Sequence, residues 1–509
     1  MIETMKYVSK PIVERIPPKR QEAARHYGSH PYFTRRPWNV VHSYIEHFCP
    51  PGGTVLDPFG GSGVTAIEAL VLRRRAIHVD INPLANFITE QIAVSPVDLA
   101  ALRAAFQNVS QRCEHLLKEW SKKPDRFFED RQPPYWYPKD VSLPSNADAD
   151  LVEQLFTPRQ LFSLSLILDA INQEKQKCLR DLMRFSFSGA LAKTNRTFIS
   201  AKNRAETRGG PTIFSVYRYN IPKSPVELDA WEQFESRFRN LVVCKRETNR
   251  LIGDFYSSAN CRVVHGSATA LRGVCKPASV DYVFTDPPYG AYIAYLDLST
   301  MWNAWLGFPV TEADKEVEVI EGGDKDHSRD HYVRLLRKTI SEIHRALKPD
   351  GWFSLVFQHR DAALYSAIIE ATEDSGLYHV NTVSQALDVV WSMHKKKNKM
   401  NVMSGELILN FQKTARKQAH PSKQKPIDLG QVICEVAAEE IRSHRGASTE
   451  SIFNHLMVRL IDLKQISQHA VTLEEVLGHL ANSGFSFDSD TGRWYLHDKP
   501  SLDQMSLGF

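Results

Sequence analysis

Short apolar runs alternate with helix-spaced segments along most of this chain. The first clear example spans residues 54–80, where an apolar run ends at Asp57 and a second apolar run ends at Asp80. A glycine-rich turn and a stretch with helical spacing lie between them. Strand, turn, helix and strand in this order form one βαβ unit of a parallel sheet. The pattern therefore predicts an α/β domain that begins within the first hundred residues.

Five later apolar runs complete the predicted sheet. Residues 261–266, 280–286 and 351–359 have the continuous apolar character of buried parallel strands. Residues 388–393 and 405–411 are predicted to form a closing antiparallel pair. The expected fold class is therefore α/β, with a doubly wound, seven-strand, Rossmann-like sheet.

The segments outside the sheet define the expected domain organisation. We expect a polar N-terminal arm over residues 1–29, a large and mostly helical insertion over 91–259, and a basic linker over 413–426. Residues 427–509 show helical spacing followed by a hairpin pattern, which predicts a small, winged-helix-like α+β domain. That segment has 12 acidic and 6 basic residues, a net charge of −6. Such a charge disfavours contact with a DNA backbone, so a protein partner or self-association is expected there.

Composition and charge narrow the class of protein. The chain has 509 residues, a formal net charge of +4 and 42% apolar residues, which excludes a uniformly basic nucleic-acid coat. Its seven cysteines include no Cys-x-x-Cys pair, so neither a disulfide scaffold nor a metal site is expected. The N-terminus lacks an apolar signal core, and no apolar run reaches about 18 residues. These features predict a cytoplasmic protein without a membrane span.

The turn after the first predicted strand carries the first candidate chemistry, Asp57-Pro58-Phe59-Gly60-Gly61-Ser62-Gly63. Glycines here let the backbone turn sharply and approach a ligand closely. A dinucleotide site is the nearest alternative, because Asp80 lies roughly where a ribose-binding acid is expected. Asp57 argues against it, since a carboxylate at the mouth of the turn would repel a pyrophosphate. The same carboxylate suits the ammonium and sulfonium of S-adenosylmethionine, whose ribose Asp80 would hold.

A second motif, Asp286-Pro287-Pro288-Tyr289, ends a very apolar predicted strand. Ligands bind at the carboxyl ends of strands in open α/β sheets. The prolines fix the backbone and remove two N–H donors, so adjacent carbonyls can act as acceptors in a rigid turn. A carboxylate and one such carbonyl can accept both hydrogens of an amino group, which turns the nitrogen lone pair towards a methyl donor. Tyr289 offers a stacking surface for a base, worth roughly 1–3 kcal/mol. A turn that merely caps the strand is the structural alternative.

These motifs resemble those of the DNA amino-methyltransferases, the S-adenosylmethionine-dependent adenine-N6 and cytosine-N4 class. Residues 55–65 resemble the family's cofactor motif, and residues 286–289 resemble its catalytic motif. Residues 30–45 resemble the motif that precedes the cofactor loop. Residues 263–268 resemble the strand beside the cofactor adenine, and residues 347–357 resemble the strand that follows the catalytic motif. Ser267 stands where the family usually has an acid. The resemblance covers residues 30–90 and 260–412 and implies a split methyltransferase domain over those ranges.

The resemblance also implies which residues form the site. The implied catalytic residues are Asp286, Pro287, Pro288 and Tyr289. The implied cofactor-binding residues are Phe33, Thr34, Asp57, Pro58, Phe59, Gly61, Ser62, Gly63, Asp80, Ile81 and Ser267. The order of the motifs resembles that of enzymes whose target-recognition region lies between them, which assigns this role to residues 91–259.

Within that region, residues 191–223 carry a net charge of +6 with interleaved aromatic side chains. Phosphate contacts are therefore expected from Lys193, Arg196, Lys202, Arg204 and Arg208. A solvated charged loop is the alternative. The same two interpretations apply to Lys395–Lys399.

The implied activity is methylation of a base that is flipped out of double-stranded DNA. The first residue of DPPY favours adenine N6, and cytosine N4 stays open. An RNA guanine-N2 methyltransferase is a further alternative, because some of those enzymes carry DPPYG, although only about 50 residues precede the cofactor loop here. The last alternative is a catalytically silent DNA-recognition subunit. The motif residues Asp57, Asp80, Asp286 and Tyr289 are all intact, which argues against it.

Overall fold

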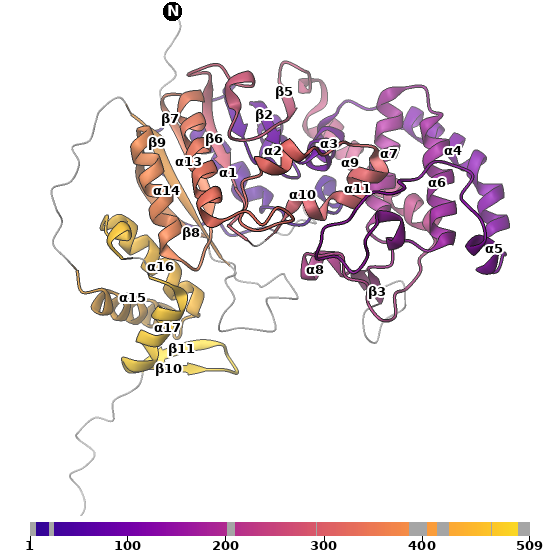
Figure 1. Ribbon diagram of the computed structural model, residues 1–509. Helices are drawn as coiled ribbons and strands as arrows, with labels where there is room; N and C mark the ends of the chain where they lie inside the picture. The colour runs from indigo at the N-terminus through magenta and orange to yellow at the C-terminus, as the bar shows by residue number, and fades with distance from the viewer. Residues whose placement is uncertain are drawn as a thin grey trace, which may run out of the picture. The chain divides into compact units, whose positions relative to one another are not determined.

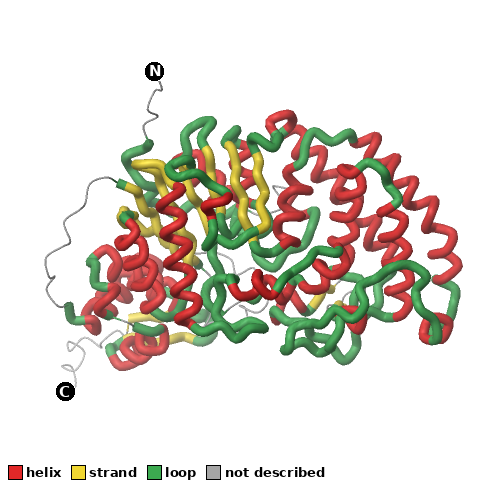
Figure 2. The backbone as a smooth tube through the Cα atoms, turned by 45° about the horizontal axis from the view of Figure 1, so that its top comes forward, coloured by secondary structure: helices red, strands yellow, loops and turns green. Residues whose placement is uncertain are grey.

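The computed structural model describes residues 7–19, 25–200, 209–291, 293–385, 405–414, 427–469 and 471–496. The chain divides into two compact units. The first comprises residues 1–8 and 18–353, and the second comprises 9–17 and 354–509. The figures distinguish the elements by label and by type (Figures 1 and 2).

Seven strands form the main sheet in the order β5-β2-β1-β6-β7-β9-β8. Their bounds are β1 (Thr54–Asp57), β2 (Arg75–Asp80), β5 (Cys261–His265), β6 (Val280–Thr285), β7 (Leu347–Phe357), β8 (Leu377–Gln385) and β9 (Glu406–Lys413). Strand β1 runs parallel to both β2 and β6, and β2 runs parallel to β5. The chain runs outward from β1 through β2 to β5 and then crosses to β6 on the other side of β1, so the sheet is doubly wound. The switch point at which ligands bind in such sheets lies between β1 and β6. The predicted seven-strand α/β fold is confirmed.

Apolar side chains hold helices against the central strands. All four residues of β1 and all six of β6 are buried. Helix α1 (Trp38–Phe48) contacts β6, and its Phe48 ring lies 5.5 Å from Tyr282 and 4.7 Å from Trp352 between centroids. Helix α2 (Val64–Val71) contacts α1, β1 and β2, so the chain on both sides of β1 is fixed by packing.

Local signals explain where the helices near the sheet begin. The Asn82 side chain accepts a hydrogen bond from Leu84 N and caps α3 (Pro83–Ala93), which also has proline in its first turn. Ser328 caps α13 (Arg329–Ala346) in the same way, through His331 N. Three short helices, α10 (Tyr295–Leu298), α11 (Thr300–Leu306) and α12 (Glu312–Glu316), follow the chain out of β6.

The segment between β2 and β5 is mostly helical, as predicted. It contains α4 (Leu99–Trp120), α5 (Arg126–Glu129), α6 (Pro158–Asn172), α7 (Lys177–Leu191), α8 (Ile213–Val216), α9 (Ala230–Leu251) and a small hairpin of β3 (Phe198–Ser200) and β4 (Gly209–Pro211). The four long helices α4, α6, α7 and α9 pack on one another (Figure 1). Buried Lys245 of α9 donates to the carbonyls of Ile92 and Val94 at 2.9 and 2.7 Å, which ties this helix to the end of α3.

The second unit contains two antiparallel strands and several helices. Strands β8 and β9 are antiparallel, and α14 (Ala362–Ser375) packs on β8. Helices α15 (Leu429–His444), α16 (Thr449–Asp462) and α17 (Leu473–Asn482) precede a hairpin of β10 (Phe485–Asp488) and β11 (Arg493–Leu496). Helices followed by a hairpin are the elements expected for residues 427–509. That this segment forms a winged-helix-like domain stays a prediction.

The closing antiparallel pair differs from the one predicted. The partner of β9 is β8, residues 377–385, whereas the sequence pattern predicts a strand over 388–393, which lie outside the described residues. Most β8 side chains are only half-buried, and the register shifts between His379 and Asn381. A half-buried strand with such an irregularity has no continuous apolar run, which is why the pattern did not reveal it.

Candidate active site

A cavity of about 870 Å³, which includes space continuous with solvent, lies at the carboxyl ends of β1, β2 and β6. Its walls come from the segment before α1 (32 and 34–36), the turn after β1 (57–62, 64 and 65), the end of β2 (80–82), the residues after β5 (267 and 268), the end of β6 (284, 286 and 288), and residues 295 and 317–319. All of these belong to the first unit.

The turn after β1 needs glycine at two positions. A Cβ atom at Gly60 would lie 2.1 Å from the His78 ring. Gly63 has φ +84° and caps the start of α2, and a Cβ there would lie 2.4 Å from Thr89 Oγ1. Only glycine allows this turn to close against β2 and α3 while its backbone faces the cavity.

Replacement of Gly63 by alanine is expected to destabilise the fold by about 2–4 kcal/mol, through positive φ and overpacking against Thr89. Urea unfolding monitored by circular dichroism measures the change. Gly273→Ala is the matched control, since a Cβ there meets nothing within 4 Å and its φ is not positive. Equal stability of the two variants would show that the turn relaxes freely.

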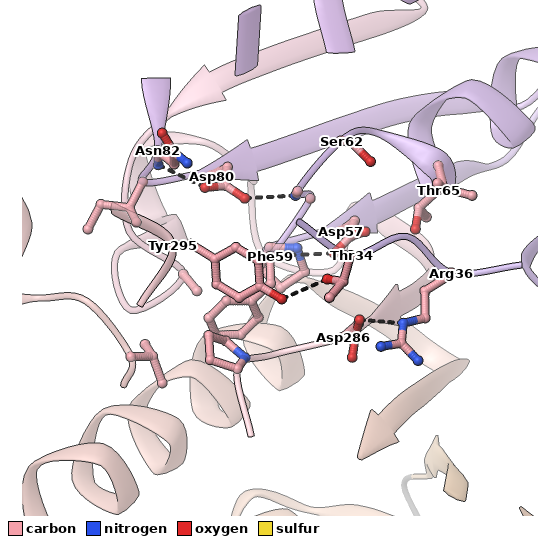
Figure 3. A pocket seen from close by; sticks show the side chains of 18 of the residues that line it. Thr34, Arg36, Asp57, Phe59, Ser62, Thr65, Asp80, Asn82, Asp286 and Tyr295 are labelled. Carbon is pink, nitrogen blue, oxygen red and sulfur yellow. Dashed lines mark hydrogen bonds and ion pairs between the residues drawn. The ribbon is translucent and has the colours of Figure 1, made fainter. Parts of the chain in front are cut away.

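Two carboxylates, buried Asp57 and half-buried Asp80, face the cavity from neighbouring strands (Figure 3). Asp80 Oδ2 accepts a hydrogen bond from Gly61 N at 2.7 Å, and its Oδ1 accepts one from Asn82 N at 2.8 Å. Asp57 Oδ1 accepts hydrogen bonds from Thr285 Oγ1 at 2.6 Å and Phe59 N at 3.1 Å. Both acids are held rigidly at the ends of β2 and β1.

Burial changes the acidity of both groups. Loss of hydration raises the pKa of Asp57 to about 7 and that of Asp80 to about 6, although their hydrogen bonds favour the ionised forms. A cationic ligand group beside Asp57 would therefore favour the ionised form of this carboxyl. The ligand would bind more tightly at a pH at which more of Asp57 is ionised.

The segment before α1 forms another wall of the cavity. Thr34 Oγ1 and Tyr295 Oη lie 2.7 Å apart, within hydrogen-bonding distance. Arg35 donates from Nε to Ser62 Oγ at 2.9 Å and from its two other nitrogens to the carbonyls of Tyr27 and His30, each at 2.7 Å. Arg35 thereby clamps this segment onto the glycine-rich turn.

The DPPY motif follows β6 and brings its carboxylate to the cavity (Figure 3). Asp286 Oδ2 lies 2.6 Å from Arg36 Nε, and Asp286 Oδ1 accepts a hydrogen bond from Tyr289 Oη at 2.5 Å. Tyr332 Oη of α13 donates to the Pro288 carbonyl at 2.7 Å. The turn is thus fixed from α13, and the carboxylate is held from two sides.

The structure gathers most of the predicted site residues around this one cavity. The lining includes Thr34, Asp57, Pro58, Phe59, Gly61, Ser62, Asp80, Ile81, Ser267, Asp286 and Pro288. Phe33, Gly63, Pro287 and Tyr289 are not among the residues that line it. Phe33 is buried and packs edge-on against Trp302 and Tyr295, so it supports the wall from behind.

Five further lining residues could not be selected from sequence: Tyr32, Arg35, Arg36, Tyr295 and Glu318. Tyr32 and Tyr295 stack with ring centroids 6.1 Å apart. Glu318 is buried, which with the nearby Asp297 raises its pKa to about 8. The neighbouring Val317 carbonyl accepts a hydrogen bond from Ser267 Oγ at 3.3 Å, so Glu318 enters the cavity beside Ser267. The arginines lie within the motif at residues 30–45, which does not by itself show which of its side chains reach the cavity. The region of Glu318 carries no recognisable pattern.

The predicted phosphate-contacting residues are only partly described. Lys202, Arg204 and Arg208 lie outside the described residues. Lys193 is half-buried, and burial together with Arg237 lowers its pKa. Arg196 donates to the Gln154 carbonyl at 3.1 Å. DNA contact by these residues stays a prediction.

Two searches concern other kinds of site. In the described parts of the chain, no group of three or more His, Cys, Asp or Glu side chains could hold a metal ion. The helices within those same ranges are all too short or too polar to cross a membrane.

Comparison with known proteins identifies the family to which these motifs belong. The family model N6_N4_Mtase, described as DNA methylase, matches residues 11–90 and 280–467, more than half of the chain. The type II methyltransferase M.MvaI of Kocuria varians is 24% identical over 289 residues, which cover 53% of this chain and 55% of that protein. The type II methyltransferase M.MjaII of Methanocaldococcus jannaschii is 24% identical over 115 residues, 21% of this chain and 22% of that protein. The chain thus spans about half the length of the first of these relatives and about a fifth of the second.

Two solved structures are similar to this chain at low sequence identity. A protein of Thermus thermophilus, crystallised in complex with S-adenosyl-L-methionine, is 16% identical; the match covers 35% of this chain and 60% of that one, with a TM-score of 0.17. The geranyl diphosphate C-methyltransferase of Streptomyces coelicolor is 8% identical over 80% of this chain and 92% of that one, with a TM-score of 0.25.

Proposed function

We propose that this chain, which belongs to the N6/N4 DNA methylase family, methylates the exocyclic amino group of a base in DNA. The observation that carries the proposal is that Asp286, at the end of β6, lines the same cavity as Asp57 and Asp80. We assign Asp286 to the amino group and the other two acids to the cationic cofactor. A single cavity can hold both reactants side by side.

S-adenosylmethionine is the cofactor, and when bound it supplies an electrophilic methyl group on a sulfonium. The cavity suits a ligand that is cationic at one end and carries hydroxyl groups in its middle. We assign the ammonium to Asp57 and the ribose hydroxyls to Asp80. Ser267 and Glu318 lie together further along the wall and are assigned to the adenine end.

The DPPY residues would position the acceptor nitrogen. Asp286 and the Pro287 carbonyl accept the two hydrogens of the amino group, and Tyr289 offers its ring as a stacking surface. The transfer would form a nitrogen–carbon bond and break the carbon–sulfur bond of the cofactor, which would leave as S-adenosylhomocysteine. The Asp286 carboxylate would hold one amino hydrogen and is placed to accept the proton that the nitrogen loses. Positioning of the two reactants supplies most of the acceleration in such a transfer. Tyr332 contributes by fixing the Pro288 carbonyl.

The target base and the partners belong to the same proposal. We favour adenine N6, because the catalytic motif begins with aspartate, over cytosine N4. Residues 91–259 would read double-stranded DNA from which the base is flipped, and the two curated relatives are type II methyltransferases, so a restriction–modification setting is proposed. The acidic C-terminal segment is proposed to bind a protein partner or a second copy.

Methyl transfer from radiolabelled S-adenosylmethionine to purified nucleic acids tests the activity. We expect the label to appear in duplex DNA. After digestion of that DNA to nucleosides, we expect it in N6-methyl-2′-deoxyadenosine. Label in N4-methylcytosine would correct only the base. Label in RNA guanine would overturn the proposal that DNA is the substrate. DNA binding without any methyl transfer would instead support the alternative of a catalytically silent recognition subunit.

Cofactor affinity should depend on pH through Asp57. Its pKa of about 7 in the free protein would fall when an ammonium binds, so affinity should rise as pH rises. Below pH 7 we expect the Kd of S-adenosylhomocysteine, which keeps the ammonium, to increase by up to about tenfold for each unit that pH falls. Calorimetric titrations between pH 5.5 and 8.5 measure this.

Asp57→Asn is the control for that measurement. The variant should bind more weakly at pH 8 and show a flatter profile, with the remaining slope due to Asp80. If the Kd of Asp57→Asn changed with pH as steeply as that of the wild type, the pH dependence would have to come from a group other than Asp57.

A further inference from the structure

The catalytic carboxylate is already engaged on both oxygens. Arg36 Nε lies 2.6 Å from Asp286 Oδ2, and Tyr289 Oη donates to Oδ1 at 2.5 Å. The two side chains of the ion pair are only 17% and 22% exposed, so solvent screens their attraction less than that of a surface ion pair. A base that is to donate its amino hydrogens to Asp286 must therefore replace an existing partner.

The position of Arg36 resembles that of the proposed substrate. Its guanidinium lies over the Tyr289 ring, 5.8 Å from the ring centroid, within the range of a cation–π contact. A guanidinium is planar and presents N–H donors at its edge, as the amino edge of adenine or cytosine does. Arg36 thus makes two of the three contacts proposed for the flipped base, one with the Asp286 carboxylate and one with the Tyr289 ring.

The backbone holds Arg36 at this place. Arg35, immediately before it, is clamped to Ser62 and to two backbone carbonyls, and α1 begins at Trp38. Thr34 is joined to Tyr295 across the cavity. Movement of the Arg36 side chain therefore does not require movement of the segment that carries it.

We infer that Arg36 is a positioning residue of the target-base site, whose guanidinium occupies the place of the base between Asp286 and Tyr289 until the base displaces it. The inference rests on the proposed function, because it assigns the same two contacts to the base. Arg36 keeps the Asp286 carboxylate oriented while no base is present. It also makes entry competitive, so that a base gains the site only by exchanging with the guanidinium.

Binding of isolated bases tests the inference without a DNA recognition sequence. Full-length protein saturated with S-adenosylhomocysteine is titrated with 9-methyladenine and with 1-methylcytosine, and saturation-transfer NMR reports the affinity. Removal of the competing guanidinium in Arg36→Ala should tighten binding of one base by about fivefold or more. The gain should disappear in Arg36→Ala/Asp286→Ala, which lacks the carboxylate.

Two further variants separate this role from general effects. Arg334→Ala on α13 removes one exposed positive charge elsewhere and should bind bases as the wild type does. Arg36→Lys keeps the charge without the planar group and should give an intermediate affinity. Thermal melting and the Kd of S-adenosylhomocysteine establish that each variant is folded and retains its cofactor site.

Base affinity that is unchanged, undetectable or weaker in folded Arg36→Ala would overturn the inference. If Arg36→Ala bound S-adenosylhomocysteine more weakly and showed no gain in base affinity, Arg36 would be assigned as a cofactor ligand instead. Methyl transfer by the wild-type protein is measured separately. Its absence would count against the proposed function, whereas the base titrations need no turnover.

Discussion

Substitution of Asp286 by alanine is expected to lower kcat/KM for methyl transfer by about 10³-fold or more, because the amino nitrogen loses its principal acceptor in a partly buried site. Affinity for S-adenosylhomocysteine should stay within about threefold of the wild type, since Asp57 and Asp80 are untouched. Single-turnover transfer of labelled methyl groups measures the first quantity and calorimetry the second.

Asp281→Asn provides the matched control for this substitution. Asp281 lies near the other end of β6, is buried, and accepts hydrogen bonds from Thr54 N at 2.9 Å and Lys348 Nζ at 2.7 Å. Its replacement should lower stability but leave transfer by the folded fraction close to that of the wild type. More than a tenth of the wild-type rate in Asp286→Ala would remove Asp286 from the chemistry.

Substitution of Asp80 by alanine should weaken cofactor binding by about 10²-fold, since hydrogen bonds to a charged group contribute about 1.5–3 kcal/mol each. The variant loses the proposed acceptor for the ribose hydroxyls and also the acceptor for Gly61 N and Asn82 N. Part of the loss will therefore come from loosening of the glycine-rich turn.

Calorimetry with S-adenosylhomocysteine measures the Asp80 effect, with urea unfolding to confirm the fold. Asp80→Asn helps to divide the contributions, because its amide oxygen can still accept from one backbone N–H. We expect an affinity between those of Asp80→Ala and the wild type. An Asp80→Ala protein that is folded and binds within threefold of the wild type would contradict the assignment.

The parts of this molecule that were predictable are those in which local sequence dictates geometry. A buried strand followed by a turn that only glycine can adopt fixes Asp57 and Asp80 relative to each other, so one continuous segment reveals both. The DPPY turn is similarly local, because its rigidity comes from its own prolines.

Other features depend on contacts between distant segments and left no pattern to read. Arg36 meets Asp286 across 250 positions, and its role follows only from the distance between the two side chains. Glu318 reaches the cavity from an irregular stretch after α12, where no periodicity distinguishes one acid from the next. Strand β8 was missed for a related reason, since its half-buried side chains form no apolar run.

Expression of this chain in a bacterial host that lacks DNA methylation, followed by sequencing that detects modified bases, tests the central claim most directly. We predict N6-methyladenine at one recurrent sequence in the host genome, and none in cells that express Asp286→Ala. N4-methylcytosine at a recurrent sequence would retain the enzyme and change its base. A genome free of both marks, with folded protein in the cells, would contradict the assignment of this chain as a DNA methyltransferase that acts on its own.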